Sequence, residues 1–119
     1  MDYIFVYGTL KRNQINHHFL NDAKYINDGV LNGYKMWNLG SYPAIKEGVG
    51  FVFGEVYEVD EDTLFEIDKL EDEGVLYKKV LESIIMNDGK TIECFVYVYL
   101  LDIDKYPLNN EGITFNYRG

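Results

Sequence analysis

Short apolar runs, separated by glycine, proline and polar residues, predict a chain built mainly from strands. The run YIFVY at residues 3–7 is rich in β-branched and aromatic residues and ends at a glycine, which indicates a strand buried on both faces. The segments GVLNGYKMWNL (29–39) and GFVFGEVYEV (50–59) predict two more strands, the second with a bend or bulge at Gly54. Between them, GSYPAIKEG (40–48) predicts a loop because glycine and proline interrupt it.

The second half of the chain predicts a hairpin. LYKKVLESIIM (76–86) has strand composition and is followed by NDGK (87–90), whose Asp-Gly pair is typical of a hairpin turn. In TIECFVYVYL (91–100) alternate positions form two apolar faces, so we expect both faces of this strand to be covered, as inside a barrel. From Asp102 onward the chain has little periodicity, and we expect it either to wrap the domain or to fray.

Two segments have the spacing of helices. NQINHHFLNDA (13–23) places apolar residues near helical spacing and predicts a short helix after the first turn. A second helix is predicted after the strand that ends at residue 59. Either Asp60 or Thr63 caps it, since Thr63 and Glu66 have the spacing of a capping box.

These elements predict one domain over residues 1–119, of class α+β, with a small mixed β-barrel and short flanking helices. Hydrophobic residues make up 47% of the chain, which supports a stable core. No apolar run approaches the roughly 20 residues that cross a bilayer, and the first residues lack the pattern of a secretory signal. We therefore expect a cytoplasmic protein.

The formal net charge of −9 is concentrated in one segment. Residues 55–73 contain ten acidic residues and one lysine, whereas the remainder is balanced. Such a surface repels phosphate backbones and anionic lipid, so we expect no nucleic acid and no membrane among the partners. For most of these carboxylates, a solvated face that aids solubility is the simpler interpretation.

The residue types that hold metals do not cluster in this sequence. Cys94 is the single cysteine and cannot form an internal disulfide, so we expect a buried structural thiol. His17 and His18 are adjacent and would diverge by about 100° on a helix, so they cannot share one metal ion. We expect both histidines at the surface and no metal site.

One carboxylate falls on an apolar helix face. Glu71 follows Leu64 by seven positions and Ile67 by four, which returns it to within about 20° of Leu64 if the helix lasts that long. A carboxylate there is either a structural cap paired with a hydrogen-bond donor or a group kept for chemistry. Desolvation and the surrounding like charges would both raise its pKa, which makes Glu71 a candidate for proton transfer near neutral pH.

The first strand ends in the stretch FVYGTLKRNQINH (5–17), whose Gly8-Thr9 turn has two interpretations. It is either a plain strand-ending turn or a turn that aims consecutive main-chain N–H groups into one concavity, where they bind carboxylate or carbonyl oxygens.

Together these pieces resemble the γ-glutamylcyclotransferase-like family, most closely its γ-glutamylamine cyclotransferase branch. The matching pieces lie between residues 4 and 99, in the family's order: FVYGTLKRNQINH, YPAI, GEVYEVDEDTLFEIDKLEDEGVLY and CFVY. The resemblance implies a small β-barrel with a pocket at the tyrosine-glycine turn and one catalytic glutamate after the helix. It implies release of 5-oxoproline from a small-molecule γ-glutamyl substrate by attack of the α-amine on the γ-carbonyl, with no cofactor.

Two glutamates compete for the catalytic position in that resemblance. The family's pattern has an acid three residues before the glutamate and a tyrosine six after, and Asp68 and Tyr77 satisfy both for Glu71. Glu73 satisfies neither, although Glu73-Gly74 resembles the Glu-Gly found at that place in relatives. The resemblance therefore implies that Glu71 is the general acid and base. Lys79 departs from the family, in which arginine is frequent, and any salt bridge there is expected to be weaker.

The resemblance also implies a set of binding residues. Main-chain N–H groups of the turn would hold either the substrate's α-carboxylate or the developing oxyanion, and tyrosines would pack the glutamyl methylenes and donate hydroxyls. For any single tyrosine, core packing is the competing interpretation. The binding residues implied are Tyr7, Gly8, Thr9, Leu10, Tyr42, Tyr77 and Tyr97.

Two other functions remain open at this point. The first is cyclotransfer on γ-glutamyl amino acids or glutathione, which the acidic segment disfavours slightly because those ligands are anionic. The second is a non-catalytic small-molecule binding or protein-interaction module that keeps the pocket. The sequence does not indicate an oligomeric state.

Overall fold

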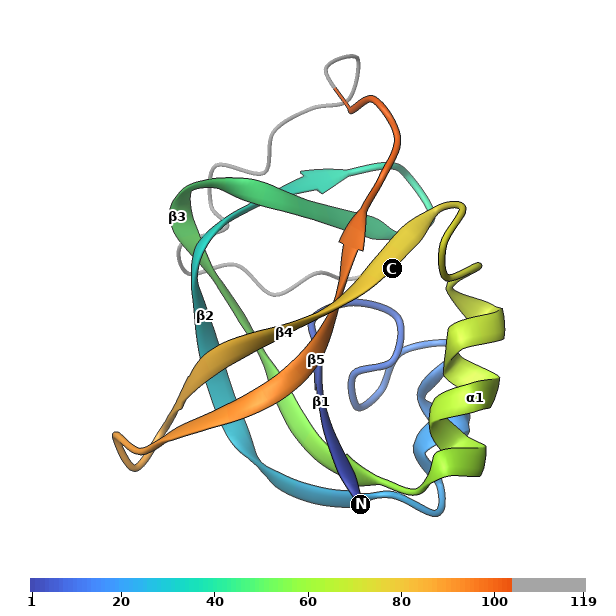
Figure 1. The fold of residues 1–119 in the computed structure, drawn as a ribbon, viewed down its shortest axis with the longest axis vertical. Coiled ribbons are helices and arrows are strands. Elements are labelled where there is room, and N and C mark those ends of the chain that lie inside the picture. The colour runs from blue at the N-terminus through green and yellow to red at the C-terminus, as the bar shows by residue number, and fades with distance from the viewer. Residues whose placement is uncertain (104–119) are drawn as a thin grey trace.

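In the computed structural model, which describes residues 1–103, five strands form a closed barrel (Figure 1). The strand order around the barrel is β1-β3-β2-β4-β5, and β1 pairs in parallel with β5 at Ile4 and Phe95, which closes the sheet. The other neighbouring pairs are antiparallel. The predicted α+β fold with a small mixed barrel is confirmed. The strands are β1 (Asp2–Val6), β2 (Lys24–Asn38), β3 (Pro43–Val59), β4 (Tyr77–Met86) and β5 (Thr91–Tyr99).

Two helical segments lie side by side along one side of the barrel (Figure 1). The first, η1 (His17–Leu20), is a single 3₁₀ turn and is shorter than the helix predicted over 13–23, because the preceding residues form separate turns. The second, α1 (Glu61–Leu70), begins at Asp60, whose Oδ1 accepts a hydrogen bond of 2.7 Å from the Thr63 N–H. Asp60, and not Thr63, is therefore the cap.

The predicted loop over residues 40–48 is wrong for most of its length. β2 and β3 form one long hairpin that turns at residues 39–42, and β3 begins at Pro43, which pairs with Asn38. Proline is tolerated there because it is the first residue of the strand. Gly54 marks no bulge either, since it pairs directly with Gly29. A Cβ at Gly54 would lie 2.4 Å from the Val6 carbonyl oxygen, so close approach of β1 explains this glycine.

The hairpin predicted in the second half of the chain is confirmed. β4 and β5 pair without interruption from Tyr77 and Tyr99 to Ile85 and Thr91. The connecting turn places Gly89 at φ +86°, a conformation that glycine adopts readily, and the Met86 N–H donates to the Lys90 carbonyl oxygen at 2.8 Å.

The core has two layers that share the barrel wall. The barrel interior receives side chains from all five strands, whereas the outer layer packs between the wall and the helices. β5 contributes to both layers, as its two apolar faces predicted, with Cys94 inside the barrel and Tyr97 outside it. The barrel interior contains Phe5, Tyr7, Leu31, Tyr34, Met36, Ile45, Val52, Val56, Ile84, Cys94 and Val96. The outer layer contains Ile4, Val6, Leu10, Leu20, Ala44, Tyr57, Val59, Leu64, Ile67, Tyr77, Tyr97, Tyr99 and Ile103.

Two further expectations concern the membrane and the last residues. Within residues 1–103, neither helical segment has the length and apolar character needed to cross a bilayer. The expectation that the segment from Asp102 wraps or frays lies, from residue 104 onward, outside the described residues.

Candidate active site

A cavity of about 330 Å³ opens where β1 ends, beside the turn between β2 and β3 and the last residues of α1. The structure brings all eight predicted site residues into its wall, from four separate parts of the sequence. Apolar and aromatic side chains dominate, and the part of the lining contributed by residues 1–103 contains no lysine or arginine. The lining residues are Phe5, Val6, Tyr7, Gly8, Thr9, Leu10, Ile15, Asn16, Ser41, Tyr42, Pro43, Leu70, Glu71, Leu76, Tyr77 and Tyr97.

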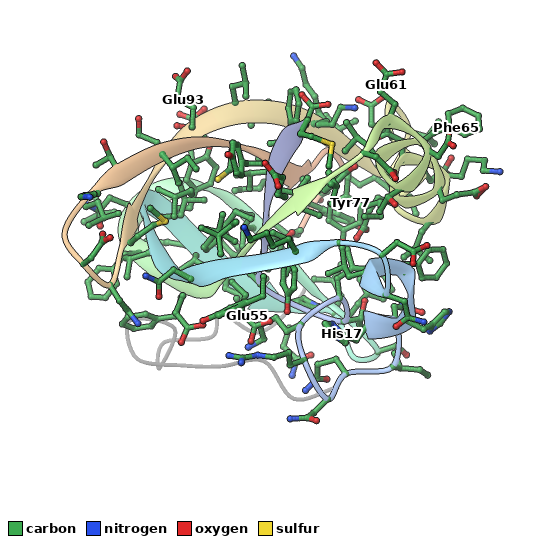
Figure 2. All side chains as sticks on the ribbon, turned by 90° about the horizontal axis from the view of Figure 1, so that it is seen from below. His17, Glu55, Glu61, Phe65, Tyr77 and Glu93 are labelled. Atoms are coloured by element: carbon green, nitrogen blue, oxygen red, sulfur yellow. The ribbon has the colours of Figure 1, made fainter. Side chains whose placement is uncertain are left out.

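Glu71 lies at the C-terminal end of α1 and continues the apolar stripe of that helix. Its N–H donates to the Ile67 carbonyl oxygen at 2.9 Å, and its backbone stays in the right-handed helical region with φ −83°. Leu64 and Ile67 on the same face are buried, whereas Phe65 points outward from the helix (Figure 2). The helix therefore carries the carboxylate toward the cavity by the same periodicity that buries its apolar residues.

The carboxylate of Glu71 is partly buried and makes no hydrogen bond or ion pair with any residue of the described range, 1–103. Burial raises its pKa from 4.5 to about 7. Desolvation alone accounts for this shift, and the neighbouring acids expected from the sequence do not contribute to it. The structure shows no donor paired with this carboxylate in that range, so the interpretation as a structural cap has no support there.

Glu73, the competing acid, is exposed and lies outside the cavity wall. Its Oε2 accepts a hydrogen bond of 3.3 Å from the Lys79 N–H, which connects the loop after α1 to β4. Of the two glutamates, the structure places only Glu71 in the cavity.

Three buried tyrosines form much of the wall, and each has its hydroxyl bound within the protein. The Tyr7 hydroxyl donates to the Tyr97 carbonyl oxygen at 2.7 Å, and the Tyr77 hydroxyl donates to the Pro43 carbonyl oxygen at 2.9 Å. The Tyr97 hydroxyl donates to Asp68 Oδ1 at 2.6 Å. Tyr77 lies in the interior of the molecule (Figure 2). These tyrosines therefore offer ring surface and oxygen lone pairs to a ligand, rather than the free hydroxyl protons that were expected.

Tyr42 differs from the other three because it is exposed. It is 36% accessible and its ring centroid lies 6.5 Å from that of Tyr77. It therefore forms part of the mouth of the cavity, together with Ile15, which is 77% accessible.

A salt bridge anchors the helix end beside the cavity. Lys79 Nζ lies 2.9 Å from Asp68 Oδ2 and 5.0 Å from the centroid of the Phe95 ring. Asp68 thus binds Lys79 with one oxygen and the Tyr97 hydroxyl with the other. Lys79 on β4 therefore forms its ion pair with Asp68, and Glu71 has no cationic partner within residues 1–103.

The turn after β1 presents main-chain groups to the same cavity. The N–H groups of Gly8, Thr9 and Leu10 form no hydrogen bond to a residue of the described part of the chain. Gly8 packs against Pro43, because a Cβ at Gly8 would lie 2.6 Å from the Pro43 Cγ. Close approach, and not an unusual φ, therefore requires a glycine at the position where the turn begins.

Eight of the described lining residues were not identified from the sequence as contributors to the site, and two of them, Asn16 and Ser41, are polar. His17, expected at the surface, is partly buried. The His17 Nδ1 lies 2.9 Å from the Leu10 carbonyl oxygen. The only signal for Asn16 and His17 was that the polar stretch following the turn ends with them. Within residues 1–103 no three His, Cys, Asp or Glu side chains are grouped to hold a metal ion.

Comparisons with known proteins identify the family of this chain. The model of the family described as gamma-glutamyl cyclotransferase, AIG2-like, matches residues 4–113. The gamma-glutamylcyclotransferase family protein YtfP of Citrobacter rodentium is 40% identical over 109 residues, which cover 92% of this chain and 91% of that protein. YtfP of Escherichia coli K12 is 35% identical over 109 residues, 92% of each chain. The crystal structure of an AIG2-like protein of Mus musculus superposes with a TM-score of 0.82 at 32% identity, covering 92% of this chain and 86% of that one.

Proposed function

The chain belongs to the gamma-glutamyl cyclotransferase, AIG2-like family, and on that premise we propose that it releases 5-oxoproline and a free amine from a γ-glutamylamine, with Glu71 as general acid and base. Family membership supports cyclotransferase activity, and the choice of substrate and of Glu71 is our inference. The observation that carries it is the unpaired, partly buried carboxylate of Glu71 in the same cavity wall as the N–H groups of Gly8, Thr9 and Leu10.

The reaction joins two ends of one substrate. The α-amine nitrogen attacks the γ-carbonyl carbon and forms the new C–N bond, after which the bond from that carbon to the leaving nitrogen breaks. Holding the glutamyl chain folded supplies much of the rate, since effective molarities of well-oriented intramolecular reactions reach roughly 10⁵ to 10⁸ M. A mainly apolar cavity of about 330 Å³ suits this task because its walls restrict the chain.

The protein must also move a proton. The α-amine arrives as an ammonium, and Glu71 would accept its proton and return it to the leaving nitrogen, a kind of step worth about 10²- to 10⁴-fold. A pKa of about 7 suits both directions of transfer, because the group is neither too weak to accept the proton nor too strong to release it. The carboxylate has no protein donor to compete with the substrate's ammonium within residues 1–103.

The charges of the cavity wall favour a γ-glutamylamine. Glu71 matches the substrate's ammonium, and the N–H groups of the turn would bind either its α-carboxylate or the developing oxyanion. Among residues 1–103, no lysine or arginine lines the cavity to pair with a further carboxylate. A γ-glutamyl amino acid or glutathione carries such a carboxylate in the leaving group, so these compounds are the weaker candidates.

A substrate panel and one pair of variants test this proposal. We expect 5-oxoproline to form from γ-glutamylamines, and more slowly from γ-glutamyl dipeptides and glutathione. Glu71→Gln should lose at least about 10²-fold in kcat, as removal of a general base does, with the fold intact. Glu73→Gln is the matched control and should retain most activity, because its amide oxygen can still accept from the Lys79 N–H.

Two outcomes would contradict this proposal. Loss of activity in Glu73→Gln with retention in Glu71→Gln would mean that the wrong acid is assigned. If no compound of the panel yields 5-oxoproline at high protein concentration, the protein is instead a non-catalytic binding module.

A further inference from the structure

Two residues behind the Gly8–Leu10 turn bind its carbonyl and hydroxyl oxygens. The Asn16 N–H donates to the Thr9 carbonyl oxygen at 2.9 Å, and the Asn16 side-chain Nδ2 donates to Thr9 Oγ1 at 3.0 Å. The His17 Nδ1 contacts the Leu10 carbonyl oxygen at 2.9 Å. A carbonyl oxygen can only accept, so this contact requires the hydrogen of the imidazole to lie on Nδ1.

Each of these carbonyl bonds fixes one planar peptide unit. The bond from His17 to the Leu10 carbonyl fixes the peptide that carries the Lys11 N–H, and this N–H in turn donates to the Gly8 carbonyl oxygen. In a trans peptide the C=O of one residue and the N–H of the next point in opposite directions. The Gly8 carbonyl accepts from the Lys11 N–H at 3.0 Å, which fixes the peptide that carries the Thr9 N–H. The Thr9 carbonyl accepts from the Asn16 N–H, which fixes the peptide that carries the Leu10 N–H. With their carbonyls bound behind, these two N–H groups are directed away from the residues that hold the turn.

We propose that Asn16 and His17 are positioning residues, which hold the Gly8–Leu10 turn in the conformation that binds the glutamyl part of the substrate. This inference rests on the proposed function. The connection from residue 8 to residue 16 contains no helix or strand, so these side-chain bonds supplement the few main-chain bonds of its turns. His17 is partly buried and its ring lies 5.8 Å from that of Tyr57, which limits its movement.

The test compares substitutions that remove a bond with substitutions that keep it. His17→Ala removes the imidazole, whereas His17→Asn keeps a donor, because the side-chain Nδ2 of asparagine stands at the same position on the side chain as Nδ1. Thr9→Val removes the hydroxyl that Asn16 binds, whereas Thr9→Ser keeps it, and both leave the main-chain N–H in place. His18→Ala is the control, since His18 is exposed and its ring contacts Phe19 outside the cavity wall.

We expect kcat/KM for 5-oxoproline formation to fall about tenfold in His17→Ala and in Thr9→Val, the effect of losing one hydrogen bond of ordinary strength. The conservative variants should stay within about threefold of the wild type, and His18→Ala should not differ from it. A fall confined to kcat would assign the turn to the oxyanion, and a rise confined to KM would assign it to the α-carboxylate. Either split supports the proposal.

Binding of 5-oxoproline gives a second readout that needs no turnover. Its addition should shift the amide NMR signals of Gly8, Thr9 and Leu10 in the wild type and do so more weakly in His17→Ala. Unchanged kinetics and unchanged binding in His17→Ala and Thr9→Val, with the wild type active, would overturn the positioning role alone. A wild type that neither forms nor binds 5-oxoproline would overturn the proposed function and this inference together.

Discussion

At the scale of single residues, Glu71 is unusual because a carboxylate occupies a helix position whose neighbours on the same face are buried apolar side chains. The helix periodicity that buries Leu64 and Ile67 also turns this carboxylate inward, where it has no donor among residues 1–103. An acid with a raised pKa opposes folding in its ionised form. The protein therefore keeps a group that weakens the fold at neutral pH, as is common where proton transfer is needed.

The cost to stability has a definite pH dependence. Glu71 has a pKa of about 7 in the folded chain and 4.5 as an ordinary carboxyl. Between these values the folded state binds more protons than the unfolded state, so stability falls as pH rises and the full penalty is present above about 7. Glu71→Gln should raise the free energy of unfolding by up to about 3 kcal/mol near pH 8 and by little near pH 4.

Denaturant unfolding of both proteins at the two pH values measures this difference. Glu73→Gln serves as the control, because Glu73 is exposed, and it should show no such pH-dependent gain. An equal effect of Glu71→Gln at both pH values would mean that the ionisation of Glu71 is not what weakens the fold.

At the scale of elements, the salt bridge between α1 and β4 joins Lys79 to Asp68, three positions before Glu71, and not to Glu71 itself. Asp68 Oδ2 binds Lys79 Nζ at 2.9 Å and Asp68 Oδ1 accepts from the Tyr97 hydroxyl. The burial that raises the pKa of Tyr97 keeps that hydroxyl protonated, so it remains a donor. Asp68, which lies about one helical turn before Glu71, therefore has its charge paired with Lys79.

Removing this cation should move the pH profile of the reaction. In Lys79→Met the charge of Asp68 loses its partner, and an uncompensated anion near Glu71 disfavours ionisation of the general base. The acidic limb of kcat/KM should then shift to higher pH by a fraction of a unit, roughly 0.5. Lys79→Arg should preserve the profile because guanidinium also pairs with carboxylate. Measurement of kcat/KM from about pH 5 to 9 tests this prediction. A shift of the acidic limb to lower pH in Lys79→Met would contradict it.

Local sequence patterns predicted the elements whose residue types are typical of the structure that they form. The hairpin turn at 87–90, the buried first strand and the inward position of Glu71 all followed from composition or periodicity. The first part of β3 was missed because its proline and glycines resemble loop residues, although Pro43 merely begins the strand. Asn16 and His17 were missed because each bonds to a residue seven positions earlier in the sequence. The chain between them has no regular secondary structure, so no periodicity predicts which side chains come into contact.

At the scale of the whole molecule, the cavity forms where the two core layers meet. Tyr7 belongs to the barrel interior, whereas Tyr77 and Tyr97 belong to the outer layer, and all three line the cavity. The Tyr7 hydroxyl bonds to the main chain of Tyr97 across that boundary. Core residues of the closed barrel therefore form the inner wall of the cavity, as is typical of a preformed site, whereas the exposed Ile15 and Tyr42 lie at its mouth.

The charge of the molecule should act on substrates before they reach the cavity. The net charge of −9 is concentrated in residues 55–73, a segment that includes α1 and Glu71. Raising salt from about 0.01 M to about 1 M shortens the Debye length from roughly 30 Å to 3 Å and removes such long-range effects.

We expect kcat/KM to fall several-fold with salt for a γ-glutamyl derivative of a diamine, whose leaving group is cationic, and to rise for glutathione. A γ-glutamyl alkylamine with an uncharged leaving group is the control and should change little. Equal salt dependence of all three compounds would show that the acidic segment does not discriminate among leaving groups, and selectivity would then have to arise from contacts at the mouth of the cavity, where Ile15 and Tyr42 are exposed.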